Sequence, residues 1–354
     1  MRQTPQSPRY HGEGDVFTHT MMVCEALKSL PEYQELDETR QHLLYVAALI
    51  HDVGKIRTTV TDDSDYSAPH HAPQGSRMAR ELLWKDYGMC GTKELVELRE
   101  AICLLVRYHS LPPVVINNDD ARLRLHRLAA NGLLTQWFSI RHLCTLGKAD
   151  TLGRIAPDQQ ESLDNIALCE ELAQEEECYD SCYMFPSEHT RRAFLAGRDV
   201  WKNQPLHDDS RCEVTVLCGL PGTGKDYWIH HNMEGMPVIS LDEIRRANKI
   251  SPTDKQGAVA QMAREQAKVF LRKQQPFVWN ATNIMPQMRQ SLINLFESYH
   301  ARVKIVYLET DWRTLLTRNS GRENVVPQSV IEKMLRNIVL PEAHEARTVE
   351  WRSV

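Results

Sequence analysis

The chain has 354 residues and a formal net charge of -5, with 42 lysines and arginines against 47 aspartates and glutamates. This balance argues against a protein that bulk positive charge holds to nucleic acid, although it leaves room for a local basic groove. Nine cysteines without paired C-x-x-C spacing are typical of reduced thiols, and no stretch is apolar enough to predict a membrane span. We therefore expect a soluble, cytoplasmic protein, long enough for two domains of ordinary size.

The N-terminal half has the periodicity of helices. A polar lead of about ten residues, expected to be mobile, precedes amphipathic stretches at 15–30 and 40–51. The second stretch ends in HDVGK, where we expect Gly54 to provide the helix-ending turn. His51 and Asp52 therefore stand together at a helix end. A metal between them requires both side chains to curl inward, and the structural alternative is a capping Asp beside a core His.

Histidines and aspartates follow the order H, HD, D along this half, as His19, His51, Asp52 and Asp150. Two further segments contain histidines, HHAPQG with His71 and RYHSLP with His109. With these motifs, residues 10–185 resemble the HD-domain metal-dependent phosphohydrolases. The resemblance implies an all-α, HD-type helical domain and six ligands for two metals.

In that resemblance, His19, His51 and Asp150 hold one metal, His71 and His109 hold the second, and Asp52 bridges them. Mixed nitrogen and oxygen ligands favour Mn, Fe, Co, Ni or Zn over Ca or Mg. Lys55 is a candidate for contact with a phosphate oxygen, and a solvated surface lysine is the alternative. We expect three other histidines of this half to be structural or surface residues, namely His70, His126 and His142.

The segment 201–210, WKNQPLHDDS, is interpreted as a linker between a domain at 1–200 and one at 211–354. Residues 214–217 then predict a short buried strand, followed by a turn with G-x-x-x-x-G-K spacing. Such a turn faces backbone N–H groups and a helix N-terminus toward a phosphate, and its lysine reaches the outer phosphates. The expected nucleotide-binding residues are Gly219, Gly222, Thr223, Gly224, Lys225 and Asp226.

Strands and helices alternate after this turn, with strands expected at 237–241, 276–283 and 302–308 and helices at 255–274 and 287–299. The alternation predicts an α/β domain with a parallel sheet, whose ligands bind at the carboxyl ends of the strands, where Asp242 and Asn280 fall. Asp242 is a candidate general base for an attacking hydroxyl, although a helix N-cap also fits its position. Arg245, one turn later, could grip an acceptor phosphate.

The segment LLTRNSGRE at 315–323 has the character of a lid. Arg322 first and Arg318 second are candidates to stabilise a transferring phosphoryl group, and pairing with Asp311 or Glu323 is the alternative. Together GLPGTGKD, DEIR, WNATN and RNSGRE resemble the polynucleotide 5′-hydroxyl kinase branch of P-loop kinases, which implies ATP, magnesium and a catalytic Lys225. The chain departs from that pattern at Asp226, where Ser or Thr normally meets magnesium, and at Asn280, where many P-loop enzymes carry an Asp. A carboxylate is also a hard ligand, so Asp226 could meet magnesium directly or through water.

The order of the two domains resembles that of the bacterial HD-Pnk end-healing enzymes. The resemblance implies a bifunctional enzyme that phosphorylates 5′-OH ends of RNA or DNA and removes 2′,3′-cyclic, 2′- or 3′-phosphates, with a ligase acting downstream. We expect a few local contacts to hold the nucleic acid, with Arg245 as the best candidate and Arg289 and Lys304 as weaker ones. Two alternatives stay open: an HD nucleotide phosphohydrolase fused to a small-metabolite kinase, and a nucleotide-dependent binding switch.

Overall fold

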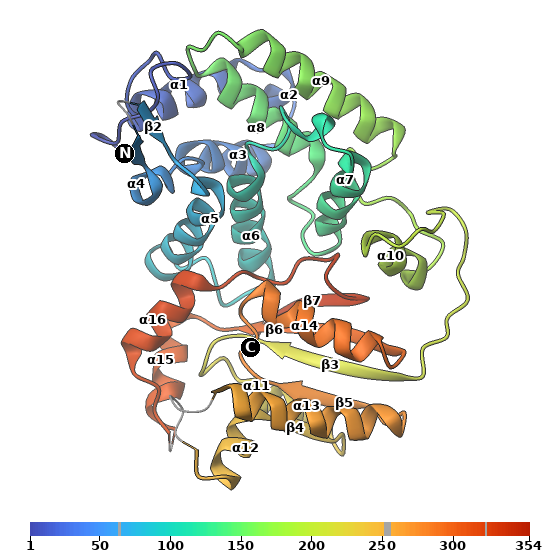
Figure 1. Cartoon of the computed structure of the whole chain (residues 1–354). Coiled ribbons are helices and arrows are strands. Elements are labelled where there is room, and N and C mark those ends of the chain that lie inside the picture. Colours follow the sequence, from blue (N-terminus) through green and yellow to red (C-terminus); the bar gives the residue numbers. More distant parts are fainter. Residues whose placement is uncertain (63–64, 251–255, 323) are drawn as a thin grey trace. The chain divides into compact units, whose positions relative to one another are not determined.

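The computed structural model describes residues 1–62, 65–250, 256–322 and 324–354, and the chain separates into two compact units (Figure 1). One unit comprises residues 1–89 and 94–184, and the other comprises residues 90–93 and 185–354. The first is helical and the second is built on a parallel sheet, which confirms the expected fold class.

The first unit consists of helices and one short antiparallel hairpin, β1 (Val60–Asp62) with β2 (Asp65–Ser67). Its helices are α1 (Val16–Ser29), α2 (Pro31–Gln34), α3 (Glu38–Ile50), α4 (Lys55–Thr58), α5 (His71–Glu81), α6 (Lys93–Tyr108), α7 (Ala121–Ala129), α8 (Ile140–Leu152) and α9 (Gln159–Glu175), with a π-helical turn η1 (Leu82–Asp86) and 3-10 turns η2 (Val115–Asn117) and η3 (Ala130–Leu133). Helices α1, α3 and α8 pack against one another around buried Val23, Leu44 and Leu143. The predicted helices at 15–30 and 40–51 are confirmed as α1 and α3.

The polar N-terminal lead is ordered, so the expectation that it is mobile was wrong. Gln6 and Ser7 are buried, and the Ser7 hydroxyl donates to Asp65 at 3.0 Å. Further along, the Gly12 amide donates to the carbonyl of Ile155 at 2.9 Å. The lead folds because the domain supplies partners for its polar groups, which a composition argument does not consider.

Gly54 does not end α3 through a left-handed turn, since its φ is -64°. Its role is close approach: a Cβ at Gly54 would lie 2.0 Å from the backbone oxygen of His71 and 2.6 Å from the amide nitrogen of Gly75. Only glycine allows the start of α5 to approach the end of α3 this closely. This contact brings His71 next to the His51-Asp52 pair.

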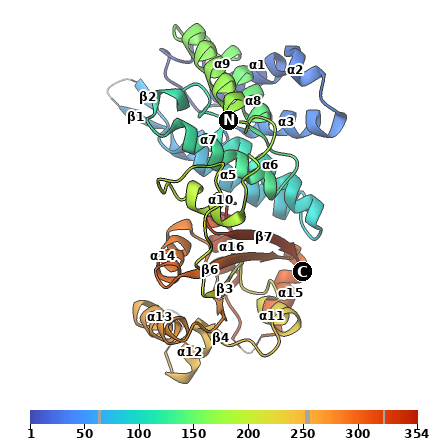
Figure 2. The same cartoon turned by 90° about the vertical axis from the view of Figure 1, so that its right-hand side faces the viewer.

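The second unit has a five-stranded sheet in the order β4-β5-β3-β6-β7, and every neighbouring pair is parallel. Its elements are α10 (Glu188–Leu195), β3 (Cys212–Cys218), α11 (Lys225–Asn232), β4 (Val238–Ser240), α12 (Leu241–Ala247), α13 (Gln256–Arg272), β5 (Phe277–Asn280), α14 (Pro286–Glu297), β6 (Ala301–Glu309), α15 (Trp312–Ser320), α16 (Gln328–Asn337) and β7 (Thr348–Ser353). Helices α13 and α14 cover one face of the sheet, and α11 and α15 cover the other (Figure 2). The expected strands and helices are present. Lys255, where the long helix was predicted to begin, lies outside the described residues.

Strand β7 was not predicted. It pairs with β6 from Lys304 with Thr348 to Glu309 with Ser353 and completes one edge of the sheet. Its sequence, TVEWRS, does not alternate in burial, and Trp351 is the one buried position of the strand. A strand this polar at an edge leaves little periodic signal.

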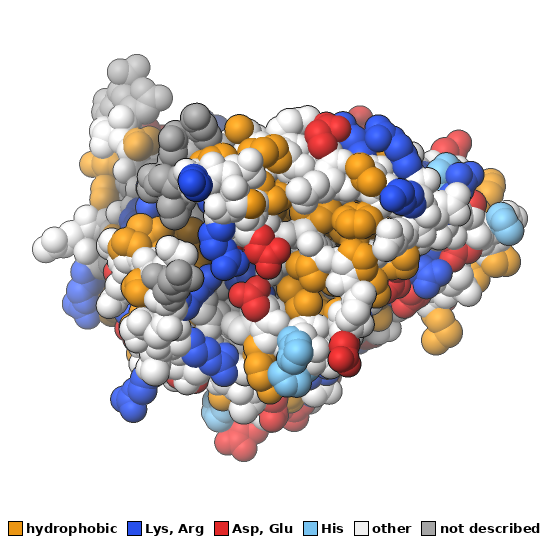
Figure 3. Space-filling view, turned by 90° about the horizontal axis from the view of Figure 1, so that it is seen from below, with side chains coloured by type: hydrophobic (Ala, Val, Ile, Leu, Met, Phe, Trp, Pro, Cys, Tyr) orange, Lys and Arg blue, Asp and Glu red, His pale blue; other side chains and the backbone are white. Residues whose placement is uncertain are grey.

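The surface in the view of Figure 3 has its lysine and arginine side chains in several separate groups, with apolar stretches between them. On this face there is no continuous basic tract among the residues drawn in colour. Within the described ranges, moreover, no helix combines the length and the apolar character needed to cross a membrane.

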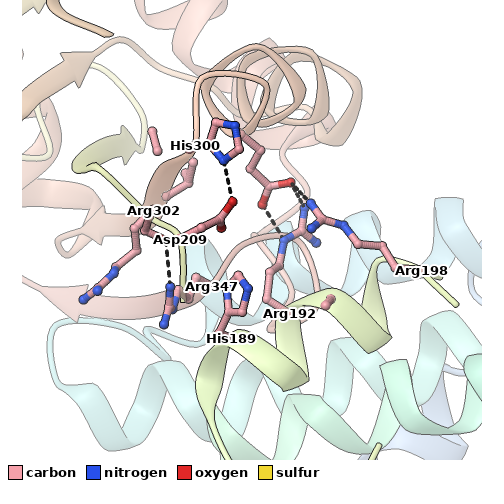
Figure 4. Close-up of a pocket in the computed structure, with 12 residues that line it drawn as sticks. His189, Arg192, Arg198, Asp209, His300, Arg302 and Arg347 are labelled. Carbon is pink, nitrogen blue, oxygen red and sulfur yellow. Dashed lines mark hydrogen bonds and ion pairs between the residues drawn. The ribbon is translucent and has the colours of Figure 1, made fainter. Parts of the chain in front are cut away.

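The long continuous part of the second unit begins at Phe185, before the segment interpreted as a linker. Arg192 of α10 makes two hydrogen bonds, of 2.7 and 3.1 Å, to Glu297 at the end of α14 (Figure 4). Asp208, inside the expected linker, accepts from Arg347 at 2.7 Å and from Arg302 at 3.3 Å. These ion pairs attach α10 and the following segment to the sheet, so the compact unit starts earlier than the composition indicated.

Candidate active sites

Five segments of the first unit bring the histidines and aspartates of the H, HD, D pattern together. His19 lies on α1, the His51-Asp52 pair follows α3, and Asp150 lies on α8. His71 is the first residue of α5 and His109 follows α6. All six expected ligand residues therefore meet in one place.

The Nε2 atoms of the histidines face the two carboxylates in two groups around Asp52. In the first, His19 Nε2 lies 3.0 Å from Asp150 Oδ1 and 3.6 Å from Asp52 Oδ2, and His51 Nε2 lies 3.4 Å from the same Asp52 oxygen. In the second, the Nε2 atoms of His71 and His109 lie 3.4 and 3.8 Å from Asp52 Oδ1. One carboxylate thus presents a different oxygen to each histidine pair, which is the arrangement a bridging ligand needs.

The other ring nitrogen of each histidine is tied to an acceptor. The Nδ1 atoms of His51, His71 and His109 bond the carbonyls of Ala48, Ala68 and Val106 at 2.7, 2.9 and 2.8 Å. His19 Nδ1 lies 3.0 Å from Glu13 and 3.2 Å from the carbonyl of Gly153. A carbonyl accepts only from N–H, so these contacts place a proton on Nδ1 and make Nε2 the atom that would bind a metal in place of a second proton.

Burial and charge oppose each other in this cluster. Burial alone lowers the pKa of His51, but Asp52 and Asp150 outweigh it and raise that pKa to about 10. Burial favours protonated Asp52, yet the charges of Lys55 and His51 hold its pKa well below the usual range. Ionised carboxylates therefore hold this buried cluster together.

One atom of the cluster indicates that these residues fit a cation. Asp52 Oδ1 is buried and accepts no hydrogen bond within the part of the chain that the structure describes. An ionised oxygen left without a partner in the interior costs several kcal/mol as an order of magnitude. A divalent cation between Oδ1 and the two nearby Nε2 atoms would remove that cost, and these donor atoms are of the types that bind transition metals.

Lys55 is buried, so the alternative of a solvated surface lysine was wrong. Its Nζ lies 2.7 Å from Asp52 Oδ2, 2.7 Å from Gln6 Oε1 and 3.4 Å from His11 Nε2. Gln6 and His11 come from the N-terminal lead, as does Glu13, which bonds His11 and His19. Sequence reasoning assigned no function to these three residues. The available signal was a short run of polar and ionisable residues directly before the helix that carries His19.

Of the three histidines set apart as structural or surface residues, His70 is exposed and the other two are buried. His126 is buried, and its Nε2 lies 2.9 Å from Glu176. His142 is buried away from the cluster, and burial lowers its pKa to about 4. All nine cysteines are free thiols.

In the second unit, the glycine-rich turn follows the central strand β3 and leads into α11. Gly219 and Gly222 have φ values of 148° and 84°, and a Cβ on either would lie within 2.7 Å of a backbone oxygen, of Leu308 or Leu315 respectively. Only glycine fits these positions. The Thr223 hydroxyl donates to the Leu220 carbonyl at 2.9 Å, so this side chain stabilises the turn itself.

Lys225 begins α11 and folds back over the turn, where its Nζ donates to the carbonyls of Gly219 and Leu220 at 3.0 and 2.8 Å. Burial lowers the pKa of Lys225 to about 8. The charges of Asp226 and Asp242 raise this pKa, and the charge of Arg322 lowers it. The turn and its lysine thus have the form of a phosphate-binding loop.

Asp226 and Asn280, the two departures from the kinase pattern, contact each other. Asn280 ends β5, beside β3, and its Nδ2 donates to Asp226 Oδ1 at 2.6 Å. On the loop, the site therefore has the carboxylate of Asp226 where a Ser or Thr hydroxyl is usual. On the strand, it has the amide of Asn280 where a carboxylate is usual. The second carboxylate oxygen of Asp226 remains available to a hard cation.

Asp242 is the second residue of α12, and the helix N-cap is Ser240, whose hydroxyl accepts from the Glu243 amide at 3.3 Å. The capping role considered for Asp242 is thus filled by another residue. Asp242 Oδ1 accepts from Arg245 at 3.2 Å, and its Oδ2 lies 3.8 Å from Arg322 of the predicted lid. The expected base, acceptor-binding arginine and first lid arginine therefore lie together.

The second lid arginine and the alternative partners of the lid arginines lie as follows. Arg318 lies beside the loop, 3.2 Å from where a Cβ on Gly224 would be, and donates to the carbonyl of Val354 at 3.3 Å. Asp311, the alternative partner for a lid arginine, caps α15, and Glu323 lies outside the described residues.

Two weaker candidates for nucleic-acid contact are engaged inside the second unit. Arg289 is fully buried and pairs with Glu345 at 2.6 and 2.7 Å, so its assignment to a surface contact was wrong. Lys304 pairs with Glu350 at 2.6 Å on the sheet. Arg245 is thus the candidate that remains.

The fold and the two sites define an HD domain and a P-loop domain. Residues 16–130 match the family model described as HD domain, and residues 214–341 match the one described as AAA domain. The match at 214–341 lies inside the second compact unit, and the match at 16–130 lies in the first apart from residues 90–93. The chain thus joins a helical HD domain to a P-loop kinase-like domain, a pairing that implies metal ions in the first and ATP with magnesium in the second.

Single relatives cover only parts of the chain. Heterogeneous nuclear ribonucleoprotein U-like protein 2 of Mus musculus is 26% identical over 150 residues, and that of Homo sapiens is 25% identical. These matches cover 37% of this chain, and the chain spans only 20% of the length of these curated relatives.

Solved structures similar to the chain include a putative kinase from Chloroflexus aurantiacus (13% identity, TM-score 0.36) and a gluconokinase from Sinorhizobium meliloti (15%, 0.31). Each covers 41% of this chain, with 86% and 84% of its own length aligned. Kti12 of Chaetomium thermophilum is 13% identical with a TM-score of 0.29, over 40% of this chain and 88% of its own. TM-scores this low carry no argument about function.

Proposed function

We propose that this protein is a bifunctional nucleic-acid end-healing enzyme. Its P-loop domain transfers the γ-phosphate of ATP to a 5′-OH end, and its HD domain removes a 2′,3′-cyclic, 2′- or 3′-phosphate. The observation that carries the proposal is the Asp242 carboxylate between Arg245 and the lid residue Arg322, in the same chain as the six-residue His/Asp cluster. Both groups suit phosphoryl chemistry, and a broken strand presents both ends for repair.

In the HD domain, His19, His51 and Asp150 would hold one metal ion, and His71 and His109 would hold a second, with Asp52 shared between the two groups. Metal ions bound there would lower the pKa of an attacking water and neutralise the phosphate. We assign them to Mn, Co, Ni, Fe or Zn from the donor types. The Nδ1 contacts of the four histidines fix the rings, so the protein holds the ligand geometry before a substrate enters.

In the P-loop domain, the oxygen of the 5′-hydroxyl attacks the γ-phosphorus of ATP. Asp242 accepts the proton that this hydroxyl loses. The bond between that phosphorus and the bridging oxygen of ADP breaks, and ADP leaves. Lys225, Arg322 and Arg318 balance the negative charge that builds up on the transferred group. Arg245 binds the phosphate next to the acceptor hydroxyl.

We assign Asp226 as a ligand for magnesium. Asn280 Nδ2 donates to its Oδ1 at 2.6 Å. This hydrogen bond fixes the carboxylate and therefore also orients its other oxygen. Magnesium prefers hard oxygen ligands and keeps several waters, so one carboxylate suffices beside the ATP phosphates. The carboxylate on the loop would then replace both the usual hydroxyl and the usual strand carboxylate.

The acceptor is expected to be a polymer end that a few contacts hold. The Asp242 side chain is 68% exposed, so an acceptor can approach it from solvent without being enclosed. With a net charge of -5, the chain offers no bulk attraction to a polyanion. Two to four phosphate contacts on a single strand would give a log-log salt slope between roughly -1.5 and -3.

The test is incubation with γ-labelled ATP and either a 5′-OH oligonucleotide or a panel of small alcohols and sugars. Label on the oligonucleotide alone is the expected result. Label on a small alcohol would establish the small-metabolite kinase, and ATP binding without any transfer would establish the nucleotide-dependent switch. RNA and DNA acceptors of equal sequence in the same assay would define the preferred polymer.

A further inference from the structure

The amide of Gln6, in the N-terminal lead, has one atom engaged in the HD site and one atom without a partner. The Lys55 ammonium lies 2.7 Å from this amide, and because an ammonium can only donate, the atom that faces it must be the carbonyl oxygen Oε1. The orientation of the amide is therefore fixed by chemistry. Its Nε2, with two N–H donors, is buried and finds no acceptor among the described residues.

Lys55 itself has no donor to spare. Its three N–H groups match three neighbours: Asp52 Oδ2 and Gln6 Oε1, each at 2.7 Å, and His11 Nε2 at 3.4 Å. A phosphate oxygen could bond Lys55 only by displacing one of these. Lys55 is thus a fixed positive charge beside the metal cluster, and the uncommitted donor next to it is Gln6 Nε2.

The lead is held firmly enough to place that donor. His11 Nδ1 lies 2.8 Å from Glu13 Oε1, and the same oxygen lies 3.0 Å from His19 Nδ1. The other Glu13 oxygen accepts from the Ile155 amide at 2.8 Å. Gln6 is 6% exposed, so its amide is buried beside the metal-site residues and not on the outer surface. A buried, unpaired amide donor is costly, which suggests that a ligand satisfies it.

We propose that Gln6 is a substrate-binding residue of the HD site. Its Nε2 donates to a non-bridging oxygen of the phosphate ester being hydrolysed, while its Oε1 holds Lys55 against Asp52. The ligand class is a phosphate mono- or diester, or the phosphate released from it. This inference rests on the proposed phosphohydrolase activity of the domain but not on nucleic acid as its substrate.

The test uses the full-length, Mn-loaded protein with two substitutions. Gln6→Glu keeps the acceptor for Lys55 and replaces the donor by a like charge, and Gln6→Met keeps the length and removes both functions. Ser7→Ala is the matched control, because Ser7 is buried in the same lead and bonds Asp65 instead of the cluster. Manganese content measured by mass spectrometry and near-UV circular dichroism report on metal loading and folding.

Binding of inorganic phosphate is measured by calorimetry in a Lys225→Ala background, which removes the phosphate loop of the other domain as a second site. Hydrolysis of p-nitrophenyl phosphate gives KM and kcat. Both Gln6 variants should weaken phosphate binding and raise KM by about 10- to 100-fold, the range for one hydrogen bond to a charged group. Because the bond is made in ground and transition states alike, kcat should change little.

Three results would overturn the proposal. The first is unchanged phosphate affinity in both Gln6 variants, and the second is an equal loss of phosphate affinity in Ser7→Ala. The third is a loss of phosphate affinity that parallels a loss of bound manganese. A purely structural role for Gln6 would lower metal content or kcat and leave the phosphate affinity of the loaded protein unchanged. If phosphate binding depends on Gln6 but no nucleic-acid end is hydrolysed, the inference stands and the proposed function fails.

Discussion

Replacing Asp242 by asparagine should separate catalysis from stability in the P-loop domain. Asparagine has the shape of aspartate, and its carbonyl can still accept from Arg245, which lies 3.2 Å away. It cannot accept the proton of the attacking hydroxyl. Loss of a positioned base lowers a rate by about 10² to 10⁴-fold, which corresponds to about 2.7 to 5.4 kcal/mol of transition-state stabilisation.

The stability cost should be far smaller. Asp242 is 68% exposed, and its pairs with Arg245 at 3.2 Å and Arg322 at 3.8 Å reach into solvent. Exposed pairs of this kind contribute about 0 to 1 kcal/mol each. The substitution should therefore leave the unfolding midpoint nearly unchanged while kcat falls by orders of magnitude.

The assay is transfer of γ-labelled phosphate from saturating ATP to a 5′-OH oligonucleotide, with KM for ATP measured alongside. Glu243→Gln is the matched control, since Glu243 is the exposed neighbour on the same helix and serves the N-cap only through its backbone amide. The control should keep wild-type kcat. A wild-type rate in Asp242→Asn would remove this carboxylate from the mechanism. An equal loss of kcat in Glu243→Gln would show that a disturbed helix, and not the loss of a base, lowers the rate.

Three further predictions concern the separation of the sites, their metals and the core of the second unit. Asp52→Ala should abolish the phosphatase and spare the kinase, whereas Lys225→Ala should do the reverse; loss of both activities in either folded variant would refute two independent sites. After transition metals are stripped, the phosphatase should recover with Mn, Co or Ni and the kinase with Mg alone, and full phosphatase activity in Mg would contradict the ligand assignment. Arg289→Met should lower the unfolding free energy by about 3 to 5 kcal/mol in urea titrations, because it leaves the buried Glu345 carboxylate with the Glu342 amide but without its cationic partner. A change below about 1 kcal/mol, the value for an exposed pair, would show that Glu345 finds another donor.

Local patterns in the sequence predicted the centres of both sites. The G-x-x-x-x-G-K turn lies after a buried strand, as predicted, and the carboxyl ends of β3 and β5 bring Asp226 to Asn280. The meeting of His19, His51, Asp52 and Asp150 was implied by the resemblance to the HD-domain phosphohydrolases. The spacing of the phosphate-binding turn can be recognised in a single sequence, whereas these four residues lie too far apart along the chain for their spacing to set a geometry.

Contacts between distant segments were not predictable in the same way. Gln6 meets Lys55 across 49 positions, and neither residue type indicates the other. Gly54 has an ordinary φ, and the reason for a glycine there is the backbone of His71, which only the folded chain reveals. The early start of the second unit, at Phe185, follows from ion pairs such as Arg192 with Glu297, 105 positions apart.

The most direct test of the central claim uses one RNA duplex with a nick flanked by a 2′,3′-cyclic phosphate and a 5′-OH. The purified protein, with ATP, magnesium and manganese, should open and remove the cyclic phosphate and phosphorylate the 5′-OH, so that a ligase added afterwards seals the strand. Asp52→Ala should leave only the 3′ side blocked, and Lys225→Ala only the 5′ side. A wild-type protein that leaves both ends unchanged, while hydrolysing free nucleotides or phosphorylating a small alcohol, would contradict the end-healing function.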